Sequence, residues 1–220
     1  MKSLKEKVYN QNNRLVVAMD GPSASGKGSI GKILAKKFNL EHIQSGLLYR
    51  GLANLCMIKK IDSTDCNGII KISKCSNLMT LIKDNDLNQE NIGNYASKIS
   101  TISEVRNYVN FHLSRIIRLY PRIIMEGRDI TTVVAKDADI KVFITANVYK
   151  RAMRRYKQLQ EQGKKCMISD VLKLLKERDL RDFSRSAAPL SISPGAFIID
   201  TSDINQDQVI SKIKQHIDLD

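Results

Sequence analysis

The residues with the clearest chemistry form a glycine-rich segment, DGPSASGKGS, at positions 20–29. Gly21 and Gly26 let the backbone curl so that successive N–H groups point at one anion. Lys27 adds a positive charge that can reach terminal phosphates. An apolar run precedes the segment and a helical pattern follows it, so the free N–H groups of a helix start would face the same anion. The segment therefore predicts a phosphate-binding loop, with Ser29 as the hydroxyl that faces phosphate or Mg²⁺.

A second charged group follows another apolar run, in the segment EGRDITTVV at 126–134. Ligands of an open α/β sheet bind beyond the carboxyl ends of its strands, so this group would lie beside the glycine-rich loop. There Glu126 would hold Mg²⁺ through water, Arg128 would grip a phosphate, and Asp129 would accept a hydrogen bond from a base or sugar. A charged surface turn is the alternative interpretation.

Three arginines of the next helical pattern are also candidates for phosphate binding. At about 100° per residue, Arg151, Arg154 and Arg155 fall within an arc of about 100° beside the apolar stripe. Guanidinium groups on one arc, with few acids alongside, indicate a lid that closes over phosphates. A solvated basic face is the alternative.

The following helical pattern carries charges on its inward face. Val171 and Leu175 mark that face, which continues through Arg178, Asp182 and Arg185. Charges on a line that should be buried are costly unless they are paired or face a ligand cleft. The pattern favours a cleft wall over an internal ladder of arginine and aspartate pairs.

The elements that must position these residues alternate between strands and helices. Short, apolar, β-branched runs predict five strands at 14–19, 41–44, 122–126, 139–146 and 196–200. Helical periodicity predicts helices at 28–38, 47–57, 89–99, 102–119, 148–162, 169–184 and 206–217. This alternation predicts an α/β fold with a five-stranded parallel sheet and helices on both faces. The polar stretch from 59 to 87 reads as an insert rather than core, and the excursions are expected at about 59–110 and 150–168.

Length and composition are those of one soluble globular domain. The chain has 220 residues, of which 42% are hydrophobic and 27% are charged. We find no membrane-length apolar run, no secretory signal at the polar N-terminus and no C-x-x-C cysteine pair, so we expect a cytoplasmic protein with reduced thiols. The net charge of +13 favours an anionic partner, whether nucleic acid, membrane surface or phosphorylated small molecule.

Taken together, the motifs resemble the cytidylate kinase family from about residue 14 to the C-terminus. The form Gly-Lys-Gly-Ser at the lysine is itself typical of nucleoside-monophosphate kinases. The resemblance is carried by six segments in one order: DGPSASGKGS (20–29), QSGLLYR (44–50), ASKIS…VR (96–106), EGRDITTVV (126–134), RAMRRYKQLQ (151–160) and KERDLRDFSRSAAPL (176–190). It implies a P-loop kinase fold in a single domain, 1–220, with an insert that binds the nucleoside monophosphate and a mobile lid.

The implied reaction is transfer of the γ-phosphoryl group of ATP to CMP, and also to dCMP, with Mg²⁺. The resemblance implies that ATP phosphates lie in a loop made of Gly21, Pro22, Ser23, Ala24, Ser25, Gly26, Lys27, Gly28 and Ser29. It implies that CMP contacts Ser45, Arg50, Ser97, Arg106, Arg128, Asp129, Arg178, Asp182 and Arg185. The implied catalytic residues are Lys27, Arg128, Arg151, Arg154 and Arg155, and the implied metal site comprises Ser29 and Glu126 through water.

Within the implied acceptor site, the resemblance assigns each side chain to a part of CMP. Its phosphate would contact Arg50, Arg128 and Arg178. Its cytosine would contact Ser97, Arg106 and Asp129. Its ribose would contact Asp182 and Arg185. A monomer without nucleic-acid or membrane partners is the expected state.

Four positions depart from the family pattern. Ala24 stands where glycine is usual, Gln44 replaces an acid, Glu126 replaces aspartate, and Thr131 replaces glycine. Three other functions stay open at this point: a kinase for UMP or AMP, a nucleotide-dependent switch, and a non-catalytic protein that binds nucleic acid. Against the last, aromatic residues make up only 5% of the chain and do not alternate with basic ones.

Overall fold

The computed structural model describes residues 14–82 and 87–217. The polar N-terminal segment, in which no secretory signal was found, lies outside the described residues, as do 83–86 of the predicted insert. Five parallel strands form one sheet in the order β2-β3-β1-β4-β5. They are β1 Leu15–Asp20, β2 Glu41–Gln44, β3 Arg122–Gly127, β4 Ile140–Thr145 and β5 Phe197–Asp200. The predicted α/β fold with a five-stranded parallel sheet is confirmed.

The central strands β1, β3 and β4 are mainly apolar because both faces of the sheet are covered, and Asp20 and Glu126 lie near the carboxyl ends of β1 and β3. Successive side chains of a strand point to opposite faces. Val16 and Ala18 of β1 accordingly belong to one core cluster, whereas Val17 and Met19 belong to the other. All four side chains are at most 1% exposed, so a polar substitution on either face would meet a packed core.

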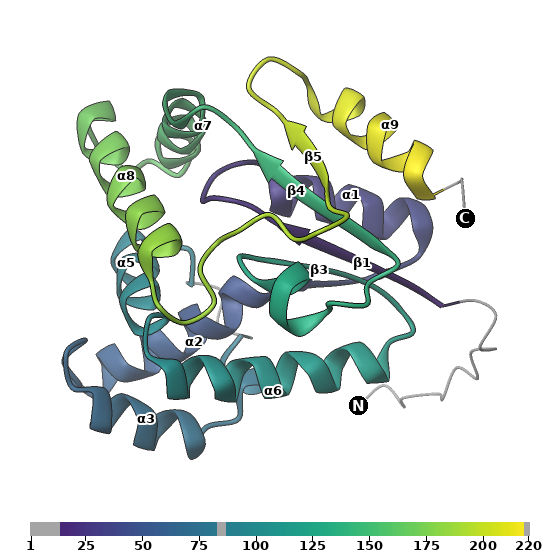
Figure 1. Cartoon of the computed structure of the whole chain (residues 1–220). Coiled ribbons are helices and arrows are strands. Elements are labelled where there is room, and N and C mark those ends of the chain that lie inside the picture. Colours follow the sequence, from purple (N-terminus) through teal and green to yellow (C-terminus); the bar gives the residue numbers. More distant parts are fainter. Residues whose placement is uncertain (1–13, 83–86, 218–220) are drawn as a thin grey trace.

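Helices cover both faces of the sheet, as predicted (Figure 1). On one face lie α1 Lys27–Phe38 and α9 Gln206–Ile217. The other face is covered by α2 Ser45–Ile58 and α6 Ser103–Leu119, with α5 Glu90–Ile99 packed against α2. These helices hold the carboxyl ends of β1, β2 and β3 at one edge of the sheet, where the loops after the strands meet.

The segment predicted as an insert consists of short helices. It contains α3 Cys66–Lys74, α4 Leu78–Leu81 and α5, after which α6 runs on past residue 110. Although the stretch is polar, Ile69 and Leu78 are completely buried in the larger core cluster. This segment is thus anchored to the core by apolar side chains from short runs in a polar stretch.

Two helices stand beyond the carboxyl edge of the sheet, α7 Val148–Glu161 and α8 Ile168–Ser184 (Figure 1). They pack on each other through a small cluster that includes Ala152, Leu159, Val171 and Leu175. Between β3 and β4, residues Ile130–Val134 form a short π-helix, η2, where no helix was predicted. Within the described residues, no helix is both long enough and apolar enough to cross a bilayer.

Candidate active site

The loop after β1 folds tightly around the side chain of Lys27. The Nζ atom donates hydrogen bonds to the carbonyl oxygens of Gly21 and Pro22, both at 2.7 Å, and to Ser25 Oγ at 3.2 Å. Gly21 has a φ of 148°, and a Cβ atom there would lie 1.9 Å from the carbonyl oxygen of Ile144. Only glycine can therefore bring the loop this close to β4.

The glycine directly after the lysine also has a steric reason. A Cβ atom on Gly28 would lie 2.7 Å from Nε2 of Gln44 and 3.5 Å from Oε1 of Glu126. Gln44 ends β2 and Glu126 lies near the end of β3, so a serine or threonine at position 28 would press on the Gln44 amide and pack directly against Glu126. The hydroxyl that usually follows the lysine directly is found one residue later, on Ser29, and both Gly28 and Ser29 line the cavity described next.

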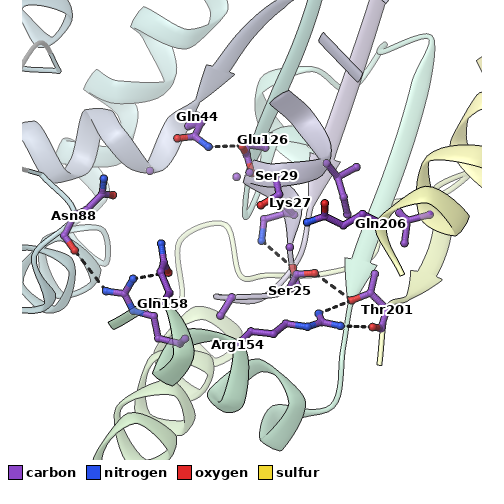
Figure 2. A pocket seen from close by; sticks show the side chains of 18 of the residues that line it. Ser25, Lys27, Ser29, Gln44, Asn88, Glu126, Arg154, Gln158, Thr201 and Gln206 are labelled. Carbon is purple, nitrogen blue, oxygen red and sulfur yellow. Dashed lines mark hydrogen bonds between the residues drawn. The ribbon is translucent and has the colours of Figure 1, made fainter. Parts of the chain in front are cut away.

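The loop opens into a cavity of about 820 Å³. Figure 2 shows Lys27 and Ser29 above it, with Asn88 and Gln158 on one side and Gln206 on the other. Its lining residues come chiefly from the loop, from α7, from the start of α9 and from the carboxyl ends of β3 and β5, and include Ala24, Ser25, Gly26, Lys27, Gly28, Ser29, Glu126, Arg154, Arg155, Thr201, Asn205 and Gln206. A cavity of this size that begins at a phosphate-type loop has room for a nucleotide.

Lys27 is electrostatically poised for an anion. Burial lowers the pKa of its ammonium group to about 7, with a further contribution from the positive charge of Arg128. In the free protein the ammonium group donates hydrogen bonds to carbonyl oxygens of the loop, and the carboxylates of Glu126, Asp20 and Asp182 favour its charged form less strongly than burial opposes it. A phosphate group in the cavity would supply the missing negative charge.

Glu126 is held in place by two residues of β2. Its Oε1 atom accepts a hydrogen bond from Nε2 of Gln44 at 2.7 Å and lies 2.9 Å from Nε2 of His42. Both contacts use Oε1 of Glu126 and do not involve its Oε2. The carboxylate of Glu126 lines the cavity of about 820 Å³. Gln44, which replaces an acid of the family pattern, here serves as the donor that orients Glu126.

A second, smaller cavity of about 110 Å³ lies between α2, α5 and α8. Its lining brings together every residue predicted for the acceptor nucleotide, namely Ser45, Arg50, Ser97, Arg106, Arg128, Asp129, Arg178, Asp182 and Arg185. Three of its arginines are at least nine-tenths buried, yet each keeps a donor atom that has no hydrogen-bond partner among the described residues: Nε of Arg106, Nε of Arg178 and Nη2 of Arg185. Buried donors of this kind are costly, which is expected where a ligand supplies the acceptors.

Carboxylates orient the arginines of this smaller cavity. Arg106 forms an ion pair with Asp129, and Nε of Arg128 donates to Asp182 at 2.7 Å. Nη1 of Arg185 lies 3.5 Å from the other oxygen of Asp182. The predicted inward face of α8 is confirmed, since Val171, Leu175, Arg178, Asp182 and Arg185 are all buried.

The two cavities meet at four shared residues, which are Gly46, Arg50, Gly127 and Arg128. Arg50 comes from α2, and Arg128 follows β3 directly. A group bound in either cavity would therefore approach the other cavity between two guanidinium groups.

The three arginines of α7 have different surroundings. Arg155 lines the larger cavity, and so does Arg154, whose Nη1 donates to Oγ1 of Thr201 at 2.9 Å (Figure 2). Arg151 is buried beside the loop, where it donates to the carbonyl oxygen of Ser23 and forms a bidentate pair with Asp179. Arg151 therefore stabilises the loop and is not among the residues that line the larger cavity.

Several residues of the site were not singled out from the sequence. Asp20 accepts hydrogen bonds from the backbone N–H groups of Ile130 and Thr131 and from the Thr131 hydroxyl. Thr131, a departure from the family pattern, thus adds a bond that glycine lacks. Thr201 follows β5, so the rule that placed Glu126 could also have found it. Glu90, which forms ion pairs with Arg155 and Arg178, belongs to no motif of the sequence that could have identified it.

Ala24 is the departure that carries a conformational cost. Its φ is 59°, in the left-handed region where glycine is favoured and where other residues lose about 1–2 kcal/mol. The loop keeps its curled shape despite this cost because Lys27 and Arg151 bind its carbonyl oxygens.

The protein has the features that define the class of P-loop nucleotide kinases. These are a parallel sheet with a phosphate-binding type of loop after β1, two adjoining cavities, and arginine-rich helices beyond the strand ends. A family model described as cytidylate kinase matches residues 17–219. The chain belongs to the cytidylate kinase family, and the resemblance inferred from the motifs is confirmed.

Named relatives agree along nearly the full chain. A cytidylate kinase of Rickettsia rickettsii (strain Sheila Smith) is 49% identical over 217 residues, which cover 99% of this chain and 98% of the relative. A cytidylate kinase of Rickettsia felis is 50% identical over 219 residues with the same coverage. Among solved structures, an uncharacterized protein of Eubacterium ventriosum matches with a TM-score of 0.55 at 12% identity, covering 94% of this chain and 99% of that one. This last match supports the fold alone.

Proposed function

We propose that this protein transfers the γ-phosphoryl group of ATP to CMP, giving ADP and CDP. The observation that carries the proposal is the junction of the two cavities at Arg50 and Arg128. Phosphoryl transfer needs the acceptor oxygen in line with the γ-phosphorus, and it needs positive charge around the moving group. A donor in the larger cavity and an acceptor in the smaller one would meet both requirements at this junction.

On the donor side, we assign the ATP phosphates to the loop from Gly21 to Ser29. Its N–H groups and the start of α1 supply donors for the phosphate oxygens. Lys27 would exchange its bonds to loop carbonyls for bonds to phosphate, a better partner for an ammonium ion. Arg154 and Arg155 reach the same cavity from α7 and would neutralise charge that spreads during transfer.

Mg²⁺ fits the oxygen ligands at the loop. Ser29 and Glu126 line one cavity, and a hydroxyl with a carboxylate is a ligand set that suits this hard cation. We assign Ser29 as a direct ligand and Glu126 as a ligand through water. Bound there, the ion would offset negative charge on the phosphates, while Gln44 and His42 hold Glu126 in position.

On the acceptor side, we assign Arg50, Arg128 and Arg178 to the CMP phosphate. The Arg106–Asp129 pair offers a donor and an acceptor to the edge of cytosine, together with Ser97. We assign Asp182 and Arg185 to the ribose side and expect dCMP to be accepted too. No general base is required, because a nucleotide phosphate is already ionised near neutral pH.

A coupled assay over CMP, dCMP, UMP and AMP, with and without Mg²⁺, tests the proposal. We expect the highest kcat/KM for CMP, and a higher value for AMP or UMP would overturn the choice of substrate. Lys27→Ala should lower kcat by roughly 10²–10³-fold, since it removes a preorganised charge at the transferred phosphate. Lys32→Ala, an exposed position on the same helix, is the matched control and should retain normal activity.

The finer expectations on cellular state belong to the same proposal. We propose a monomeric enzyme of the cytoplasm that has no nucleic-acid partner. The four cysteines are free, which suits a reducing compartment. Sedimentation of the protein with and without duplex DNA at low salt would reveal an oligomer or a complex.

A further inference from the structure

Glu90, the first residue of α5, joins two helices that approach it from beyond the sheet. Its Oε1 atom lies 2.6 Å from Nη2 of Arg178 on α8. Its Oε2 atom accepts from Nη2 of Arg155 at 2.6 Å and from Nε of the same guanidinium at 3.1 Å. The carboxylate is therefore shared between an arginine of the smaller cavity and an arginine of the larger one.

The chain just before Glu90 is tied to the junction of the cavities. Nη1 of Arg50 donates to the carbonyl oxygens of Leu87 at 2.7 Å and of Gln89 at 3.3 Å. One turn later, a Cβ atom on Gly93 would lie 2.7 Å from Nη2 of Arg50 and 2.9 Å from Nη2 of Arg178. The start of α5 is thus shaped to let both guanidinium groups approach.

The contacts of Arg155 extend this connection to the lid. Its Nη1 atom donates to Oε1 of Gln158 at 2.9 Å, and its Nη2 atom reaches the carbonyl oxygen of Asn88 at 3.4 Å (Figure 2). Arg155 is therefore held by α5 and the residues just before it, although it belongs to α7.

Positive charge in this cluster exceeds negative charge. Burial lowers the pKa of Arg50 to about 10, and the neighbouring charges of Arg178 and Arg155 act in the same direction, while Glu90 opposes them. Without a carboxylate at position 90, the guanidinium groups of Arg155 and Arg178 would repel each other, and α7 would lose its ion pair to the insert.

We propose that Glu90 is a positioning residue that couples the binding of the two nucleotides. It holds Arg178 beside the acceptor cavity and Arg155 over the donor cavity as one unit. An acceptor phosphate that orders Arg50 and Arg178 then also fixes Arg155 through the same carboxylate. This inference rests on the proposed function of the two cavities and adds a residue to it.

The experiment measures coupling rather than activity. By calorimetry, the dissociation constant of a non-hydrolysable ATP analogue is determined with and without saturating CMP. In the wild type we expect CMP to tighten binding of the analogue by about tenfold, within the usual range of coupling between sites. In Glu90→Gln the factor should fall to about two or less, while binding of the analogue alone changes less than about threefold.

Two variants control this measurement. Glu177→Gln removes an exposed carboxylate of α8 and should keep the wild-type coupling factor. Arg155→Gln removes the other end of the ion pair and should lower coupling as Glu90→Gln does, so that a folding defect of one variant does not decide the outcome. The double variant should lose no more coupling than either single one.

Three results would overturn the inference. They are an unchanged coupling factor in Glu90→Gln, the absence of coupling in the wild type, and tighter CMP binding with coupling intact, which would make Glu90 a competitor of the phosphate. Formation of CDP by the wild type is measured in parallel. If CDP forms but coupling does not depend on Glu90, only this inference fails, whereas absence of CDP refutes the proposed function itself.

Discussion

At the scale of single residues, Lys27 links the electrostatics of the loop to nucleotide binding. The free protein holds this lysine at a pKa of about 7, well below its ordinary 10.5, because burial disfavours the charged ammonium. The triphosphate of ATP would favour the charged form and raise the pKa again. At a pH between the Lys27 pKa of the free protein and that of the complex, the complex holds one more proton on Lys27 than the free protein does. Binding of ATP in this pH range therefore takes up a proton.

The prediction is that ATP affinity falls as pH rises from 7 to 9. The decrease should be roughly tenfold or more, because the free protein becomes neutral at Lys27 while the complex stays charged. Calorimetry in two buffers with different ionisation enthalpies would show uptake of a proton near pH 8. Lys27→Met should bind ATP more weakly but without this slope, and a wild-type affinity that is flat with pH would contradict the assignment.

At the scale of elements, Asp20 connects the end of β1 to η2. Its carboxylate accepts from the N–H groups of Ile130 and Thr131 at 2.9 and 2.7 Å, and from the Thr131 hydroxyl at 2.6 Å. All three side chains are buried, so no water can replace these bonds easily. These hydrogen bonds hold η2, and therefore the preceding residue Asp129, against the end of β1.

Asp20→Ala should lower the free energy of unfolding by about 2–4 kcal/mol, since it leaves two buried N–H groups without acceptors. Urea titration followed by circular dichroism measures this change. Asp203→Ala is the control, because Asp203 forms an exposed ion pair with Lys150 that contributes within about 1 kcal/mol. Equal stability of the two variants would show that Asp20 does not secure η2.

At the scale of the whole molecule, the net charge of +13 creates a field that attracts anionic nucleotides. We expect KM for CMP to rise several-fold between about 50 mM and about 300 mM salt, because salt screens this attraction. In contrast, kcat should change little, since the arginines of the cavities are buried or half-buried and are therefore screened less than exposed charges. Binding of uncharged cytidine is the control and should not depend on salt.

The sheet was predictable because a parallel sheet buried on both faces leaves a strong local pattern. Four strands read as short apolar runs, whereas β2 has the sequence EHIQ, and each strand was placed within one or two residues of its observed bounds. The insert was harder, because its buried apolar residues, such as Ile69 and Leu78, belong to short apolar runs in a polar stretch. The π-helix η2 was missed, since its stability comes from Asp20, about 110 residues away.

The sequence alone determined the family, the parallel sheet, the glycine-rich loop and the predicted residues that line the smaller cavity, because each of these follows from local runs and short motifs. Which charges meet was decided only by the tertiary structure. Asp20 with Thr131, Asp179 with Arg151 and Glu90 with Arg155 are pairs separated by 28 to 111 residues. Such pairs depend on how helices pack around the sheet, and no spacing along the chain encodes that distance.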